Sequence, residues 1–241
     1  MTHHTTTDET TVPYRWVVLC GVWLIYFSFG LTVAALGPLV TPITDDLNMT
    51  FGEMGTVLGA WPLIYILAAL PCGFLIDRVG PRRGLVIAAV IMGASGLLRS
   101  AADTHLTLFL AVAIFGLGGP LISIGAPKVI ALLFQGKNRG LAMGIYITGP
   151  GLGGVIAAST TNSIFLPFFD ENWRLVTCAY GFVTLFSGLL WLLLSQNAAG
   201  ELIKNAVSET TKESIPKTFK HLATIPSVQL VLALSIGIFF I

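Results

Sequence analysis

The sequence predicts an all-α integral membrane protein, and two observations support this prediction. Hydrophobic residues make up 54% of the 241 residues and charged residues only 10%, whereas soluble domains carry about 25% charged residues. Six apolar runs are also long enough to cross a bilayer, because a span needs ~20 mostly apolar residues at ~1.5 Å rise each. These features exclude an ordinary soluble enzyme, a disordered chain and a nucleic-acid-binding protein. The net charge of +1 indicates no charged partner.

The predicted spans follow one another along the chain. They cover Trp16–Val40, Thr56–Ile76, Gly84–Ser100, Thr107–Phe134, Gly140–Phe165 and Leu175–Leu194. A seventh apolar run opens at Val228 and continues to Ile241, which gives a rise of ~21 Å, short of the ~30 Å hydrocarbon core. We therefore divide the chain into an N-terminal tail (1–15), a six-helix domain (16–194), a linker (195–227) and the start of a truncated seventh helix (228–241).

Basic residues gather on one side of the predicted membrane. Of the 13 lysines and arginines, only Arg99 and Arg174 fall toward the side that also holds acidic residues such as Asp45, Asp46 and Asp103. Loops rich in Lys and Arg remain in the cytoplasm. We therefore expect a multi-pass protein of the cell membrane, with the N-terminus and the 195–227 loop in the cytoplasm.

No cofactor, metal site or catalytic centre is expected. The three cysteines lie singly in apolar runs, and the four histidines are scattered through polar segments. Neither residue type forms a ligand pattern. The sequence also shows no nucleophile paired with a base, so it does not predict an enzyme.

The connection after the second span carries a specific motif. Gly73 would let another helix approach closely, Asp77 is a carboxylate at the membrane border that needs a partner, and Gly80 permits a tight reversal. Two arginines would anchor the next helix at the lipid headgroups. The motif residues are Gly73, Asp77, Arg78, Gly80, Arg82 and Arg83, with Pro81 between the last glycine and the last arginines.

This motif resembles the G-x-x-x-D-R-x-G-x-R-R signature of the major facilitator superfamily of transporters, which usually has a basic residue at the position of Pro81. Residues 134–144 are similar to the family's F-x-x-x-x-R-G-x-A-x-G loop. Residues 149–154 resemble the G-P-x-x-G-G element of its antiporter branches. These residues are Gly149, Pro150, Gly153 and Gly154. Val112 stands where the family has an arginine tied to proton coupling, so that role is not carried over.

The resemblance implies the N-terminal half of a twelve-helix transporter, built from two three-helix inverted repeats. It implies that the signature motif latches the two halves together in the outward-open state. The expected partners are a small-molecule substrate, membrane lipids and the missing C-terminal six-helix half, together with a coupling ion if transport is ion-driven. No nucleic acid is expected.

The expected substrate class depends on Lys128. This lysine follows Pro127 in the fourth span, ~9 Å from the helix end at ~1.5 Å per residue, and no acidic residue is in reach by sequence. A cation there favours an anionic substrate, although a lysine snorkelling to the headgroups explains it about as well. For Arg99, snorkelling is the preferred interpretation. Tyr26 and Tyr146 complete the candidate substrate pathway.

We therefore expect secondary active transport of a small organic or inorganic anion by alternating access. Two alternatives stay open. A proton-coupled efflux antiporter of drugs or metabolites would account for the 149–154 element. A non-transporting membrane sensor or scaffold would be supported by a large soluble signalling domain.

Overall fold

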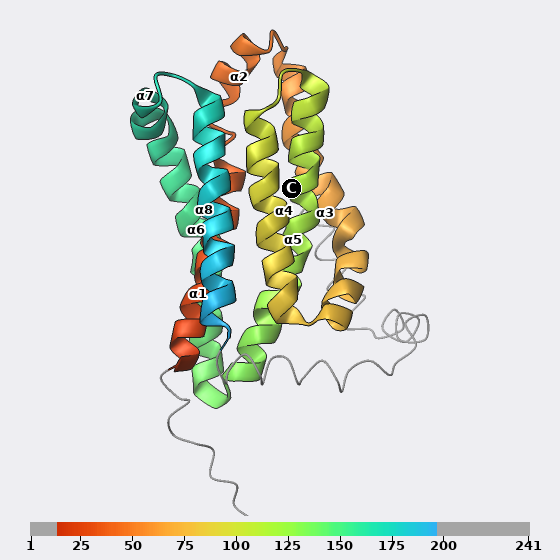
Figure 1. Cartoon of the computed structure of the whole chain (residues 1–241), viewed down its shortest axis with the longest axis vertical. Coiled ribbons are helices and arrows are strands. Elements are labelled where there is room, and N and C mark those ends of the chain that lie inside the picture. The colour runs from red at the N-terminus through yellow and green to blue at the C-terminus, as the bar shows by residue number, and fades with distance from the viewer. Residues whose placement is uncertain (1–13, 197–241) are drawn as a thin grey trace, which may run out of the picture. The chain divides into compact units, whose positions relative to one another are not determined.

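The computed structural model describes residues 14–196 as a bundle of α-helices (Figure 1). The predicted tail up to residue 13, the linker from residue 197 and the seventh apolar run lie outside the described residues. The elements are α1 (Tyr14–Ala34), α2 (Val40–Asp46), α3 (Phe51–Val79), α4 (Pro81–Ser100), α5 (His105–Leu133), α6 (Gly136–Thr160), the π-helical segment η2 (Thr161–Phe165), α7 (Leu166–Phe168) and α8 (Trp173–Leu194).

Six membrane spans are present in the described part of the chain. They are α1, α3, α4, α5, α8 and the continuous segment Gly136–Phe168, which joins α6, η2 and α7. Each is long and apolar enough to cross a bilayer. The all-α membrane fold predicted from the sequence is confirmed.

The first span ends earlier than its apolar run suggests. The sequence predicted a span to Val40, but α1 ends at Ala34 and is followed by turns, with Gly37 N donating to the Ala34 carbonyl at 3.2 Å. Pro38 has no N–H to continue the helix. Apolar burial nevertheless continues through the turns, since Leu39 is fully buried. Hydropathy alone therefore did not show the break.

The helix ends are fixed by short capping motifs. At the start of α3, Thr50 and Glu53 exchange side-chain and backbone hydrogen bonds in a capping box, and Thr104 caps α5 in the same way. Between α3 and α4 the chain reverses at Gly80, whose φ of +83° suits a residue without a Cβ. Pro81 follows at the first position of α4, where its missing N–H costs nothing.

The helix packing follows a two-fold pattern. α1 packs along α6, α3 along α5 and α4 along α8, while α4 also contacts α5 and α1 also contacts α8. Exchanging α1 with α5, α3 with α6 and α4 with α8 interchanges the α1–α6 and α3–α5 contacts, interchanges the α4–α5 and α1–α8 contacts, and leaves the α4–α8 contact in place. Two three-helix repeats of opposite orientation produce this pattern.

Two ends of the bundle are distinguished by charge. We call the end with the α3–α4 and α5–α6 connections the basic end; it lies at the bottom of Figure 1. It carries Arg78, Arg82, Arg83, Lys137 and Arg139. The opposite end, with α2 and the α7–α8 connection, is the acidic end, and it carries Asp45, Asp46, Asp103, Asp170 and Glu171.

Candidate functional site

The motif carboxylate Asp77 and the candidate pathway cation Lys128 form an ion pair. Lys128 Nζ on α5 donates to Asp77 Oδ1 near the end of α3, and the two side chains are 43% and 51% exposed. The expectation that Lys128 has no acidic residue in reach is therefore wrong. The two residues lie 51 positions apart in sequence and meet because α3 and α5 pack side by side. Paired in this way, Lys128 adds little net positive charge to the pathway.

The remaining motif residues serve the turn and the contact with α8. Arg82 Nε donates to Ser195 Oγ at 2.9 Å, and the Arg82 carbonyl accepts from Trp191 Nε1 at 3.0 Å. Arg82 is thus bound to the end of α8, whereas we expected it at the headgroups. A Cβ at Gly73 would lie 3.8 Å from Ile124 Cδ1, an ordinary contact. Gly73 therefore accommodates no close helix among the described residues. Arg78 and Arg83 are exposed.

Two tyrosines meet at Ser123 on α5 and a third packs against one of them, and we call Tyr26, Tyr65 and Tyr146 the tyrosine cluster. Tyr65 donates to Ser123 Oγ at 2.8 Å, and the Tyr26 hydroxyl lies 3.3 Å from the same oxygen. The ring of Tyr146 lies 5.4 Å from that of Tyr26. Tyr26 and Tyr146 were selected from the sequence, whereas Tyr65 was missed. Its only sequence signal is a polar aromatic residue in the middle of the second span.

The glycine and proline motif on α6 lies against α1. A Cβ at Gly153 would lie 2.1 Å from the Phe27 carbonyl oxygen, and one at Gly149 would lie 3.1 Å from Phe27 N. In the opposite direction, a Cβ at Gly30 would lie 2.1 Å from the Pro150 carbonyl oxygen. The small residues thus let the two helix backbones touch.

Arg99 is buried in the bundle. Its side chain is 2% exposed, and Nη1 donates to the Thr32 carbonyl of α1 at 3.2 Å. Its guanidinium carbon lies 5.0 Å from the centre of the Phe115 ring. The preferred interpretation from the sequence, snorkelling to the headgroups, is wrong, because a side chain that reached the headgroups would be exposed.

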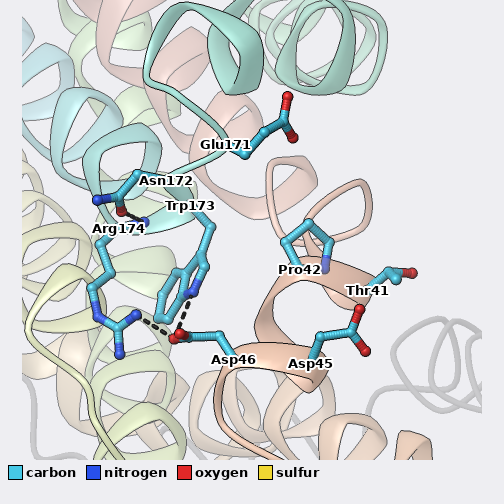
Figure 2. A pocket seen from close by; sticks show the side chains of 8 residues that line it. All are labelled: Thr41, Pro42, Asp45, Asp46, Glu171, Asn172, Trp173 and Arg174. Carbon is cyan, nitrogen blue, oxygen red and sulfur yellow. Dashed lines mark hydrogen bonds and ion pairs between the residues drawn. The ribbon is translucent and has the colours of Figure 1, made fainter.

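An open cavity of about 680 Å³ lies at the acidic end (Figure 2). Asp46 on its wall accepts hydrogen bonds from Arg174 and, at 3.1 Å, from Trp173 Nε1. Arg174 also donates to the Ala102 carbonyl at 3.0 Å, so it joins α2, the α4–α5 loop and α8. We call this contact the acidic-end clasp. The cavity is lined by Thr41, Pro42, Asp45, Asp46, Glu171, Asn172, Trp173 and Arg174.

The clasp makes the stability of the acidic end depend on pH. The Arg174 hydrogen bond holds the pKa of the Asp46 carboxyl below its usual range. A carboxyl whose pKa is lowered by folding stabilises the fold above its unfolded pKa, and this contribution is lost as pH falls through the folded value. Because Asp46 is 45% exposed, the contribution is about 0.2–1 kcal/mol.

Asp46→Asn should therefore lower the thermal unfolding midpoint in detergent at pH 7, and this difference from wild type should shrink progressively as the pH falls below about 4. Asp45→Asn is the matched control, since the neighbouring Asp45 is exposed and forms no ion pair within residues 14–196. A gap between wild type and Asp46→Asn that stays constant from pH 7 to pH 3 would exclude the ionised carboxylate as its source.

A membrane bundle of two inverted three-helix repeats is the architecture of half a secondary transporter. The Major Facilitator Superfamily matches residues 22–241, and the chain belongs to this family. It is therefore a multi-pass membrane protein.

Two curated relatives and one solved structure illustrate the similarity. The chain is 28% identical over 160 residues to a probable L-galactonate transporter of Escherichia coli, covering 64% of this chain and 34% of the relative. It is 27% identical over 216 residues to a 4-hydroxybenzoate transporter of Pseudomonas aeruginosa, covering 83% and 44%. A bacterial homologue of the human lysosomal transporter Spinster, inward-facing and occupied, superposes with a TM-score of 0.70 at 22% identity, covering 77% of this chain and 45% of that chain. The chain thus spans less than half the length of these proteins.

Proposed function

We propose that this chain is the N-terminal six-helix half of a secondary transporter that moves a small organic or inorganic anion by alternating access. The observation that carries the proposal is the two-fold packing of six spans in a chain that belongs to the Major Facilitator Superfamily. The excess of Lys and Arg at the basic end supports a cytoplasmic placement of the N-terminus in the cell membrane.

The relatives support an anion as the substrate class. L-galactonate and 4-hydroxybenzoate, which name the two relatives described above, each carry a carboxylate. The tyrosine cluster offers hydroxyl groups and aromatic faces in the membrane interior, a combination typical of small-molecule sites. Tyr26 and Tyr65 are half-buried and share Ser123, so their hydroxyls are partly satisfied before a solute binds.

The efflux alternative rests on an element that helix packing also explains in part. The 149–154 element suggested an antiporter, but Gly149 and Gly153 are accounted for by the backbone contact with α1. The same contact is needed in any bundle in which these two helices touch, whatever the direction of transport. The element therefore does not discriminate between uptake and efflux.

The proposal predicts that both halves are needed for transport. Proteoliposomes with the longer protein that contains both halves should accumulate 4-hydroxybenzoate, L-galactonate or both, saturably, and should not accumulate the cation tetraphenylphosphonium. Residues 1–241 alone should give less than about a tenth of this rate, because about half of the binding site lies in the other half.

Two results would overturn the proposal. Accumulation of the cation but of neither anion would contradict the substrate class. Saturable, selective uptake by residues 1–241, with crosslinking showing monomers, would contradict the division into halves. Crosslinked homodimers would contradict it equally, since the second half would then be a copy of the first.

A further inference from the structure

Arg99 is the buried cation of the bundle that has no carboxylate partner. The three ion pairs within residues 14–196 join Lys128 to Asp77 and Arg174 to Asp46 and Asp103, and Arg99 takes part in none of them. Its Nε is buried without a hydrogen-bond partner. At 2% exposure the guanidinium is enclosed by this half alone, so a carboxylate from another helix reaches it only by displacing these helices.

An unpaired charge that is buried inside a membrane bundle destabilises the fold. Buried charges are normally paired, and ionisable side chains inside membrane spans usually mark a functional site. The contact with the Thr32 carbonyl satisfies one N–H of Arg99 but does not neutralise it. Packing α4 against α1 does not require a cation, since a neutral donor can also bond to a carbonyl, although more weakly.

Arg99 packs against one ring of a group of three aromatic side chains. Its guanidinium stands 5.0 Å from the Phe115 ring, and Phe115 stacks on Phe29 at 5.3 Å. Phe115 also meets Trp61 edge-on at 6.2 Å. Phe29 and Trp61 are only partly buried, whereas Phe115 is fully buried. We call these three rings the aromatic layer.

Two members of the tyrosine cluster pack against the partly buried rings of this layer. The Tyr65 ring lies 6.3 Å from Trp61, and the Tyr26 ring lies 6.1 Å from Phe29. Centre-to-centre steps of 5.0, 5.3 and 6.1 Å lead from the guanidinium through Phe115 and Phe29 to the Tyr26 ring. A solute at the cluster would therefore lie roughly 10–16 Å from the guanidinium, with aromatic rings between them. A unit charge at roughly 10–16 Å and an effective dielectric constant of ~20 changes the occupancy of an anion on the order of tenfold.

We propose that Arg99 is the specificity-determining charge of this half, and that it favours anions at the tyrosine cluster through the aromatic layer without touching the solute. This inference deepens the proposed function and rests on it. Lys128 does not have this role, because Asp77 balances its charge. The charge of Arg99 therefore acts much more strongly on a charged solute than on a neutral one.

The test compares an anion with its neutral analogue in the protein that contains both halves. Uptake of 4-hydroxybenzoate, or of L-galactonate where only that anion is accumulated, is measured together with inhibition by the corresponding neutral amide. Arg99→Gln should raise the KM of the anion about tenfold and leave the inhibition constant of the amide within twofold. Arg99→Lys keeps the charge and should stay within about threefold of wild type for both.

A second variant tests the same charge without removing the guanidinium. Ser95 is fully buried on α4, one turn before Arg99, and residues four apart on a helix are neighbours. Ser95→Asp places a carboxylate beside Arg99 and should raise the KM of the anion as Arg99→Gln does. Ser95→Asn is the uncharged control and should not. If Arg99→Gln fails to insert into the membrane, the comparison of Ser95→Asp with Ser95→Asn still tests the role of the Arg99 charge.

The outcomes separate this inference from the proposed function. If the wild-type protein accumulates none of the anions, the proposed function fails. If it accumulates an anion but Ser95→Asp and any inserted Arg99→Gln keep its KM within twofold, the proposed function stands and the role of Arg99 is overturned. Equal losses for the anion and the amide would likewise overturn it, because a purely structural arginine affects both solutes.

Discussion

Gly153→Ala should destabilise the bundle more than other single-methyl additions on α6. The added Cβ would lie 2.1 Å from the Phe27 carbonyl oxygen, and this neighbour is backbone in a helix rather than the end of a flexible side chain. The two helices must therefore separate along their contact. Overpacking of this kind costs about 1–3 kcal/mol, and we expect the upper part of that range. The thermal midpoint in detergent should fall by about 10 °C.

Gly151→Ala is the matched control on the same helix. A Cβ at Gly151 meets nothing within 4 Å, and alanine favours a helix over glycine by about 1 kcal/mol. We therefore expect this variant to keep or slightly raise the midpoint. Transport by the protein that contains both halves should follow the same order. Equal midpoints for the two variants would show that α1 and α6 do not touch along Gly153.

The spans were predictable because they depend on local composition. An apolar run of sufficient length must cross the membrane wherever its neighbours lie, and each predicted run overlaps one described span. The turn at Gly80 was also predictable, since a glycine followed by Pro81 permits a reversal and then starts a helix. Positions within a span carried less information, as the early end of α1 at Ala34 shows.

The contacts between spans were not predictable, because they depend on which faces of the helices meet. The sequence placed Lys128 inside the fourth apolar run, after Pro127, and Arg99 near the end of the third, but it showed a partner for neither. Packing of α3 beside α5 gives Lys128 the carboxylate of Asp77. Packing of α4 against α1 encloses Arg99 without one. Tyr65 was missed for the same reason, because its importance lies in reaching Ser123 on another helix.

Asp77→Asn and Lys128→Gln should lower the turnover number of the protein that contains both halves by about fivefold each, with little change in KM. A carboxylate in the last turn of a helix faces the negative end of the helix dipole, so Asp77 depends on Lys128 for stabilisation. The interaction free energy between two charges in contact is about 0.5–3 kcal/mol. Because the Asp77–Lys128 pair is half-exposed, we expect its interaction free energy to be about 1 kcal/mol. We expect this energy to bias the balance between the inward-open and outward-open states, which sets turnover.

Initial uptake rates over a range of concentrations separate this expectation from a substrate-binding lysine. If Lys128 balances Asp77, the double variant Asp77→Asn with Lys128→Gln should lose less activity than the product of the single losses. The exchanged pair, Asp77→Lys with Lys128→Asp, should recover much of the turnover, because α3 and α5 still place the two charges together. A lysine that binds the solute gives the opposite result. Lys128→Gln would then raise the KM of the anion, and Asp77→Asn would leave that KM unchanged. The exchanged pair would bind the anion most weakly, because it places a carboxylate where the solute needs a cation.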